Sequence, residues 1–189
     1  EAVNIGWIKG INLGLEWIKR RTDADKRQPD ILIFANNDVV LDKPGWLERL
    51  CKHFENPTVG AVGPTSNYVI GRQNIACNVP HITEEETNTL SGFFMAVRKE
   101  IVDAEGGLDE NLSPNGIGGG DDHDYSIRIR RAGWRLVIAR DVFVWHSGSK
   151  TFMERLGAEG YNKHWRACDK ALVAKWGEIE VLRLFEHPT

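Results

Sequence analysis

Apolar side chains recur along the chain with two periods, one typical of helices and one typical of buried strands. Between Gly6 and Ile18 they stand three or four residues apart, which predicts an amphipathic helix followed by a charged, solvated stretch, Lys19–Arg27. The run Ile31–Ala35 is continuously apolar and rich in β-branched residues, so we expect a strand buried on both faces. Polar residues end it abruptly at Asn36-Asn37-Asp38.

The rest of the chain continues to alternate strands with helices. We expect a helix from Pro44, a strand Val59–Val62 closed by Gly63-Pro64, an irregular stretch Thr65–Thr89, a strand Phe93–Val97, a helix Lys99–Glu105, a helix from Asp121 to Gly133, strands Arg135–Ala139 and Val142–Trp145, and a helical stretch Phe152–Trp176. This order predicts an α/β domain with a mostly parallel sheet flanked by helices. Such sheets bind ligands beyond the carboxyl ends of their strands.

The composition of the chain argues against several classes of protein. The chain has 189 residues, of which 41% are hydrophobic, which suits one folded domain of ordinary size. Its net charge of −3 argues against binding nucleic-acid phosphates, and its apolar runs are far shorter than the roughly 20 residues that cross a bilayer. Three cysteines without metal-ligand spacing predict neither a disulfide framework nor a zinc site, and indicate a reducing compartment.

The first polar cluster is Asn36-Asn37-Asp38 at a strand end. In extended chain, Asn36 and Asp38 point the same way, so their oxygens could meet one cation or one ligand. Asn and Asp are also the usual residues of a turn that ends a strand. The local pattern leaves both interpretations open.

The second cluster is Asp121, Asp122 and Asp124, directly behind the glycine-rich loop Ser113–Gly120. Carboxylates in the first turn of a helix cap free N–H groups, which explains at least one of the three. Three like charges need a cation, a proton or an arginine, and a general base beside a mobile loop needs that kind of placement. A solvated helix start and a catalytic site both remain open.

The third cluster is His146, which follows a strand and precedes Ser147-Gly148-Ser149. Imidazole is a common ligand of transition-metal ions, and it is also a common structural hydrogen-bonding group at strand ends.

The order of these motifs resembles a family-2 glycosyltransferase with the Rossmann-like GT-A fold, and within it the bacterial rhamnosyltransferase-like members. The matching segments are Asn4-x-Gly6, Asn12-x-Gly14, Asn36-Asn37-Asp38 in the place of the Asp-x-Asp motif, Gly63-Pro64 with Ser66-Asn67, Ser91-Gly92-Phe93-Phe94 through Arg98, Gly106-Gly107-Leu108-Asp109-Glu110, Asp121-Asp122, Arg128, Gly133-Trp134 and His146-x-Gly148-Ser149. They run through nearly the whole chain.

This resemblance implies a metal-dependent, inverting sugar transferase of polysaccharide biosynthesis. The donor is a nucleotide-sugar and the acceptor a glycan or a lipid-linked glycan. Mn²⁺ or Mg²⁺ is expected to be held by Asp38 and His146, with Asn36 in place of a carboxylate. The cofactor-binding set is Asn12, Asn36, Asn37 and Asp38. Asp122 is expected to be the general base, Asp121 to order the site, and Ser113–Gly120 to close over the substrates.

The resemblance also sets expectations for organisation and partners. Residues 1–150 correspond to the catalytic part of a GT-A domain, N-terminally truncated because its first nucleotide-binding strands are absent, and residues 151–189 to a C-terminal helical extension packed on it. A sheet lacking those strands exposes an apolar edge, which predicts self-association or a covering partner. The expected location is the cytoplasm, free or peripheral at the membrane.

Two other interpretations remain open. A non-catalytic or partner-dependent carbohydrate-binding remnant of the same fold is favoured by Asn36 and by the absent strands. A hydrolase that uses Asp121, Asp122, His123 and Asp124 as a metal nest is less favoured, because neighbouring residues in a helical turn point in different directions.

Overall fold

A computed structural model describes residues 5–25, 28–113, 116–148 and 150–188. Its seven strands are β1 (Ile31–Ala35), β2 (Val39–Val40), β3 (Val59–Thr65), β4 (Glu84–Thr87), β5 (Phe94–Arg98), β6 (Arg135–Phe143) and β7 (Trp145–His146). The helices are α1 (Trp7–Asp25), α2 (Trp46–Lys52), α3 (Lys99–Glu105), α4 (Asp121–Arg131), α5 (Lys150–Trp176) and α6 (Glu178–Arg183). Short 3₁₀ turns cover His53–Glu55, Ile75–Cys77 and Glu110–Leu112.

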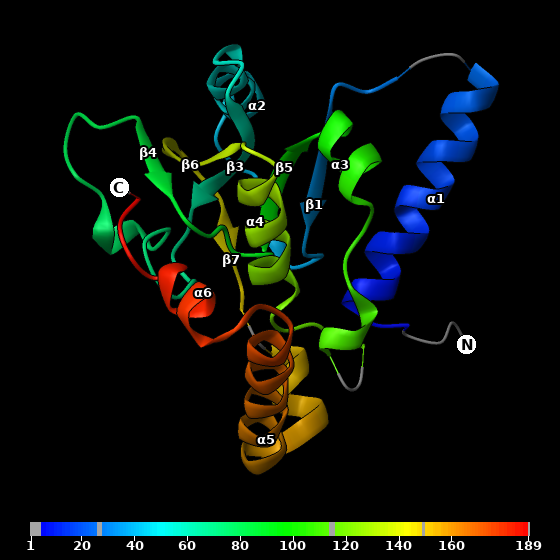
Figure 1. Cartoon of the computed structure of the whole chain (residues 1–189). Helices are drawn as coiled ribbons and strands as arrows, with labels where there is room; N and C mark the ends of the chain where they lie inside the picture. Colours follow the sequence, from blue (N-terminus) through cyan, green and yellow to red (C-terminus); the bar gives the residue numbers. More distant parts are fainter. Residues whose placement is uncertain (1–4, 26–27, 114–115, 149, 189) are drawn as a thin grey trace.

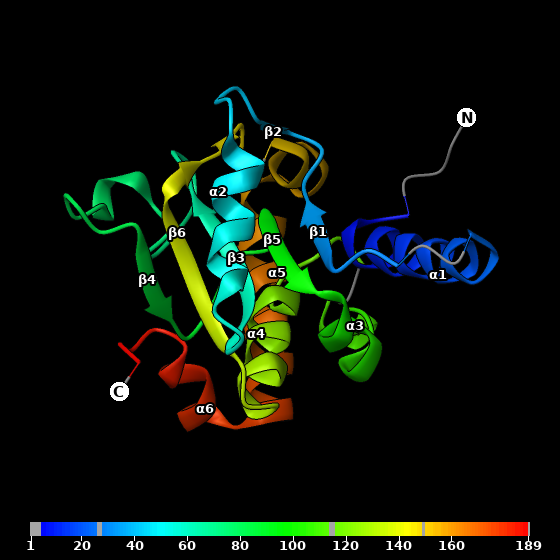
Figure 2. The same cartoon turned by 90° about the horizontal axis from the view of Figure 1, so that it is seen from above.

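The five longer strands form one sheet in the order β1-β5-β3-β6-β4, and β2 pairs with β7 in a small second sheet (Figures 1 and 2). The predicted α/β class with a helix-flanked sheet is confirmed. The sheet is mixed rather than mostly parallel: β3 and β6 pair in parallel, whereas β1–β5, β3–β5 and β4–β6 are antiparallel. The reason is that β5 inserts between β1 and β3 in the opposite direction, so β1, β3 and β6 still share one direction.

That shared direction decides where a ligand site can lie. The carboxyl ends of β1, β3 and β6 meet at one edge of the sheet, and β5 starts at the same edge. Asn36-Asn37-Asp38 follows β1, Ser66-Asn67-Tyr68 follows β3, and β7 with His146 follows β6. The sheet therefore gathers polar segments that are more than 100 residues apart in the chain.

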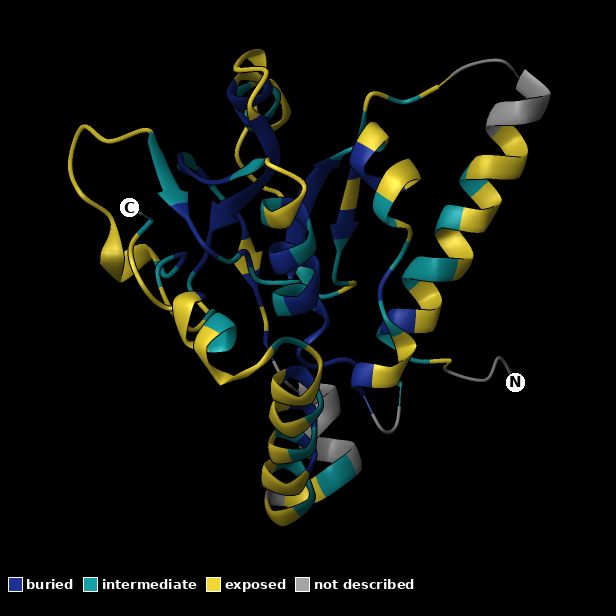
Figure 3. Ribbon diagram, viewed as in Figure 1, coloured by how far each residue is buried: buried dark blue, intermediate teal, exposed yellow. Residues whose placement is uncertain are grey.

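Two apolar clusters cover the sheet. One contains Leu32, Met95, Leu136 and Ile138 of the sheet together with side chains of α1, α3 and α4. The other contains Val62, Phe94 and Val137 with Leu50 and Phe54 of the α2 segment. A third cluster, Leu112, Ile127, Leu172 and Leu184, packs α5 and α6 against α4. In Figure 3 the strands and α4 are largely buried, whereas α1 and α5 present exposed outer faces.

Four local predictions need correction. Strand β1 is not buried on both faces, because it is the edge strand and Ile33 is 37% exposed. Helix α1 continues to Asp25 through the stretch expected to be a solvated tail, since the Lys, Arg and Ala residues of this stretch are good helix formers. Gly63-Pro64 lies inside β3 rather than closing it.

The fourth correction concerns β4, which lies in the stretch expected to be irregular. Its sequence Glu-Glu-Glu-Thr has no apolar alternation, and its pairing with β6 is supported by ion pairs across the strands, Arg135 with Glu86 and Arg140 with Glu85.

Among the described residues, no helix is both long and apolar enough to span a membrane. The three cysteines are free thiols, as expected. The predicted division at residue 150, the self-association and the covering partner stay predictions.

Candidate active site

The strand ends bring Asp38 and His146 together. The small sheet pairs Val39 with His146, and the Ser147 N–H donates to the Asp38 carbonyl at 3.1 Å. As a result, His146 Nε2 lies 3.3 Å from Asp38 Oδ1 and 3.2 Å from Asn36 Nδ2. His146 is buried, while the Asp38 side chain is 35% exposed, so the group opens to solvent on the carboxylate side.

The imidazole of His146 is held from several directions. Asn67 brackets its backbone: Asn67 Oδ1 accepts from the His146 N–H at 2.9 Å, and Asn67 Nδ2 donates to the His146 carbonyl at 3.0 Å. His146 Nδ1 lies 2.8 Å from the Tyr68 carbonyl oxygen. The ring of Phe93 stacks on the imidazole with centroids 5.2 Å apart and 21° between the planes. The orientation of the ring is therefore fixed before any ligand binds.

These contacts also fix which ring nitrogen carries a proton. A carbonyl oxygen only accepts, so Nδ1 must donate to Tyr68. In the tautomer with one ring proton, the lone pair of Nε2 faces Asn36 Nδ2 and Asp38 Oδ1. Two acceptor atoms 3.3 Å apart repel unless a proton or a metal ion lies with them. A rotation of the Asn36 side-chain amide by about 180° exchanges its oxygen and its nitrogen. The amide oxygen then lies beside His146 Nε2 as a third acceptor.

A histidine nitrogen together with carboxylate oxygens is a suitable ligand set for Mn²⁺, and carboxylate and carbonyl oxygens are suitable ligands for Mg²⁺. Within the described ranges, no group of three His, Cys, Asp or Glu side chains could hold a metal ion. An ion at Asp38 and His146 therefore needs further oxygen ligands from Asn36, water or a bound substrate.

Asp122 is connected to the Asp38–His146 pair through the residues that directly precede β5. Its Oδ2 accepts from the Gly92 N–H at 2.9 Å, and its Oδ1 accepts from the His123 N–H at 2.9 Å. Gly92 directly precedes Phe93, which stacks on His146 and whose carbonyl accepts from the Asn36 N–H at 2.9 Å. The Asp122 side chain is 22% exposed. The contacts of Gly92-Phe93 therefore connect Asp122, one of the three acids of its cluster, with Asn36 and His146.

Asp121 has a different environment. It is buried, its Oδ2 accepts from Trp7 Nε1 at 2.9 Å, and its Oδ1 accepts from the Gly119 N–H at 2.6 Å. Burial, and secondarily the charge of Asp122, raise the pKa of Asp121 to about 6. Asp121 thus connects α1 and α4 with the turn formed by Gly118, Gly119 and Gly120, which we call the glycine turn.

Asp124, the third acid of the cluster, has a structural role. It is fully buried and pairs with Arg128 Nε at 2.9 Å and with Lys175 Nζ at 2.6 Å. Asp121, Asp122 and Asp124 therefore face three different sets of partners, as the directions of neighbouring helical side chains require. This arrangement does not support the metal nest of the hydrolase interpretation.

The remaining predicted residues lie as follows. Both ends of the Asn12 amide contact the backbone of Leu108: Oδ1 accepts from its N–H at 2.8 Å, and Nδ2 donates to its carbonyl at 2.9 Å. This is a structural contact between α1 and the turn after α3, and the predicted contact with a nucleotide stays a prediction. Asn37 is exposed in the turn between β1 and β2. Asn4, Ser149 and the loop residues 114–115 lie outside the described residues.

The glycine-rich loop differs from the mobile loop that was expected. Gly118, Gly119 and Gly120 are buried, and Ser113 Oγ contacts both the N–H and the carbonyl of Gly118 at 3.2 Å. The sequence pattern indicated flexibility because it shows the glycines but not the side chains that pack on them. The described residues of this loop, 113 and 116–120, form a packed turn that leads into α4, and closure over the substrates stays a prediction.

Sequence reasoning assigned no role to Asn67, Tyr68 or Phe93, although all three contact His146. Ser66-Asn67 and Gly92-Phe93 stood among the matching segments, so a signal was present. Nothing in the linear pattern showed that these residues pack on a histidine more than 50 positions later.

Comparisons with known proteins identify the family of the chain and relatives of its fold. Residues 9–159 match the family model described as Glycosyltransferase like family 2. The chain is 27% identical over 171 residues to an uncharacterized protein of Mycobacterium tuberculosis, Rv1525, and the alignment covers 87% of this chain and 61% of that protein. It is 26% identical over 150 residues to the O-antigen biosynthesis protein RfbC of Myxococcus xanthus, covering 67% of this chain and 12% of RfbC.

A solved structure shares the fold. The mannosyltransferase PcManGT from Pyrobaculum calidifontis, in complex with GDP-Man and Mn²⁺, superposes with a TM-score of 0.50 at 17% identity, covering 86% of this chain and 55% of that one. At this identity the likeness concerns the fold, and it agrees with the GT-A-like fold expected from the sequence. This chain spans 61% of the length of its mycobacterial relatives.

Proposed function

Because the chain belongs to the family described as Glycosyltransferase like family 2, we propose that it transfers a sugar from a nucleotide-diphosphate donor to a hydroxyl group of an acceptor. The proposed reaction is a single displacement that inverts the anomeric carbon, with Asp122 as general base and a divalent cation at Asp38 and His146. The observation that carries the proposal is the convergence of the Asp38–His146 pair and Asp122 around Gly92-Phe93.

The Asp38–His146 pair is the support for a cation. His146 Nε2 and Asp38 Oδ1 present two acceptors to one position, and the hydrogen bond from Nδ1 to Tyr68 keeps the nitrogen lone pair pointed there. Asn36 contributes a carbonyl oxygen after an amide flip, a weaker ligand than the carboxylate it replaces. When bound, Mn²⁺ or Mg²⁺ stabilises the negative charge that develops on the diphosphate leaving group.

Asp122 has the features required of a base. Two backbone N–H groups hold its carboxylate in one orientation, and part of the side chain remains open to solvent. In the proposed step it accepts the proton of the acceptor hydroxyl while the oxygen attacks the anomeric carbon, and the nucleoside diphosphate leaves with the electrons of the broken bond. Asp121 fixes the turn from which α4 starts and takes no proton from the acceptor.

The substrate classes rest on similarity. PcManGT was solved with a nucleotide-sugar and Mn²⁺, which supports a nucleotide-sugar donor here. RfbC is named for O-antigen biosynthesis, which supports a glycan or lipid-linked glycan as acceptor. In the longer relatives, sequence beyond the region matched here could contribute to either substrate site.

A second candidate function is a non-catalytic carbohydrate-binding protein that uses the same group of residues. Asn36 favours it, because the replacement of a carboxylate by an amide lowers the charge available to hold a cation.

One variant separates the two candidates. Purified protein is incubated with Mn²⁺ and a panel of UDP-, GDP- and dTDP-sugars, and release of the nucleoside diphosphate is measured alongside its binding by calorimetry. If Asp122 is the base, Asp122→Asn lowers turnover by about 100-fold or more and changes nucleotide affinity little. Asp103→Asn, at a carboxylate that is 60% exposed, is the matched control. Equal turnover of wild type and Asp122→Asn, or binding without any turnover by wild type, would favour the carbohydrate-binding protein.

A further inference from the structure

Helix α5 reaches the glycine turn that precedes the proposed base. The ring nitrogen His164 Nε2 lies 2.7 Å from the carbonyl oxygen of Gly118, and because a carbonyl only accepts, this nitrogen carries the proton. Cys168, one helical turn further along α5, lies against Gly119: a Cβ at that glycine would come within 2.9 Å of Cys168 Sγ. Both side chains of α5 are buried. The helix therefore covers the turn and leaves no room for a side chain on it.

The turn depends on such contacts for its shape. Gly118, Gly119 and Gly120 all have positive φ, at 119°, 124° and 76°. Glycines reach many other conformations at similar free energy, so the sequence alone does not select this one. Two side chains hold the carbonyl of Gly118: Ser113 Oγ contacts it from one side and His164 Nε2 from another.

The glycine turn also sets the direction of the first residues of α4. The Gly119 N–H donates to Asp121 Oδ1 at 2.6 Å, and the carbonyl of Gly120 accepts the first hydrogen bond of the helix, from the Asp124 N–H at 2.9 Å. Asp122 lies between these two anchor points. A displacement of Gly118 or Gly119 therefore moves the Asp122 carboxylate relative to Gly92 and His146.

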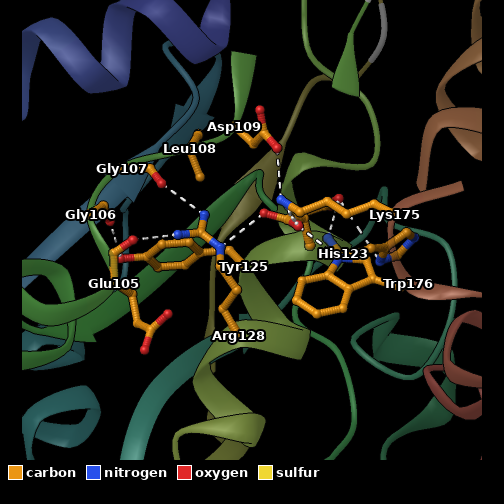
Figure 4. A network of polar contacts seen from close by, with 12 residues as sticks. Glu105, Gly106, Gly107, Leu108, Asp109, His123, Tyr125, Arg128, Lys175 and Trp176 are labelled. Atoms are coloured by element: carbon orange, nitrogen blue, oxygen red, sulfur yellow. Dashed lines mark hydrogen bonds and ion pairs between the residues drawn. The ribbon is translucent and has the colours of Figure 1, made fainter. Parts of the chain in front are cut away.

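The far end of α5 is fixed to the same helix. Lys175 Nζ lies 2.6 Å from Asp124 and 2.7 Å from Asp109, and Trp176 Nε1 donates to Asp124 at 2.8 Å. Figure 4 shows Arg128, Lys175 and Trp176 pointing toward one another in this network. Helix α5 is thus anchored at two points, the glycine turn and the first turn of α4.

We propose that His164 is a positioning residue for the proposed base: by holding the Gly118 carbonyl, it keeps the glycine turn and Asp122 in the orientation that catalysis needs. The inference rests on the proposed function. It assigns part of the active-site architecture to the C-terminal helix, whose residues the sequence analysis had placed on the outside of the domain.

The test compares three substitutions of His164 that differ in whether the new side chain can donate a hydrogen bond to the Gly118 carbonyl. His164→Ala removes the donor, and His164→Asn carries an amide N–H at the position of Nδ1, which is too short to reach Gly118. His164→Gln carries its N–H near the position of Nε2 and is expected to restore the bond. The neighbouring exposed residue provides the control, Lys163→Ala.

Two readouts are measured on the whole chain. The first is backbone hydrogen exchange of peptides that cover residues 116–122, expected to become about tenfold faster in His164→Ala and His164→Asn, because a buried carbonyl loses its donor. The second is nucleoside diphosphate release from the panel of nucleotide-sugars with Mn²⁺. Here kcat is expected to fall about tenfold with the donor KM within about twofold, since the change affects the orientation of the base rather than donor binding. His164→Gln and Lys163→Ala are expected to match wild type in both.

Each other outcome is decisive. Exchange in His164→Asn equal to that of wild type overturns the inference, and so does faster exchange with unchanged kcat and KM. A uniform loss of kcat in His164→Asn and His164→Gln alike would assign His164 a purely structural role. If wild type releases no nucleoside diphosphate from any donor, the proposed function fails, and the exchange result still decides whether His164 holds the turn.

Discussion

The buried carboxylate of Asp124 gives the sharpest prediction about stability. It accepts three hydrogen bonds from charged or strongly polar donors, namely Lys175 Nζ at 2.6 Å, Trp176 Nε1 at 2.8 Å and Arg128 Nε at 2.9 Å. The substitution Asp124→Asn keeps the shape of the side chain. It removes the charge and turns an N–H group toward one of these donors.

The magnitude follows from those contacts. A hydrogen bond to a charged group contributes about 1.5–3 kcal/mol. Lys175 and Trp176 both contact Oδ1 and Arg128 contacts Oδ2, so an asparagine oxygen in the place of Oδ1 loses the bond from Arg128 and, without the negative charge, weakens the contact with Lys175. Lys175 is 32% exposed and can turn to water, and Arg128 keeps its bonds to the carbonyls of Glu105 and Gly107. We therefore expect the free energy of unfolding to fall by about 3 kcal/mol.

The assay is urea unfolding together with thermal unfolding of the whole chain. For a chain of this size, about 3 kcal/mol corresponds to a decrease in Tm of about 6–12 °C. The control is Asp103→Asn, which removes the same charge from a 60% exposed carboxylate that pairs with Lys99 one helical turn away, and it should cost less than about 1 kcal/mol. If the two variants lose equal stability, or if Asp124→Asn stays within about 1 kcal/mol of wild type, the network does not anchor α5 as argued.

Two further variants test other parts of the site. The pKa of Asp121 is raised to about 6 by burial, so the folded protein holds this proton more tightly than the unfolded chain does, and its contribution to stability is lost as pH rises from about 4 through about 6. Asp121→Asn removes this dependence, so the stability of the variant relative to wild type should increase by up to about 3 kcal/mol between about pH 4 and pH 7. Urea unfolding of both proteins at the two pH values measures this change. A difference in stability that is the same at both pH values contradicts the burial argument. Asn67→Ala removes both bonds to the His146 backbone and should weaken Mn²⁺ binding about 10- to 100-fold in an EPR titration, whereas unchanged affinity would mean that the bracket does not orient the ring.

The fold could be predicted where the pattern of apolar residues carries the information. Ile31–Ala35 and Lys99–Glu105 form the expected strand and helix with the expected bounds. Strand β4 could not be found in this way, because Glu84–Thr87 is polar and is stabilised by arginines of β6 that lie about 50 positions away. The direction of β5 was equally out of reach, since a local pattern does not say between which strands a new one inserts.

The candidate site shows the same division. Asp38, Asp122 and His146 follow from strand ends and a helix start, and the structure brings these segments together at the edge where β1, β3 and β6 end. The residues that orient them were not assigned a role. Asn67 and His164 contact distant backbone and Phe93 stacks on a distant ring, and a sequence shows such contacts only when the fold is known.

The central claim is that Asp38 and His146 hold a divalent cation beside the proposed base. The most direct measurement is an EPR titration of Mn²⁺ with wild type, Asp38→Ala and His146→Ala, with Asp103→Ala as control. The account predicts a single Mn²⁺ site per chain in wild type and in the control, with affinity at least about tenfold weaker in each of the two site variants. No Mn²⁺ binding by wild type, or equal binding by wild type and Asp38→Ala, would contradict it.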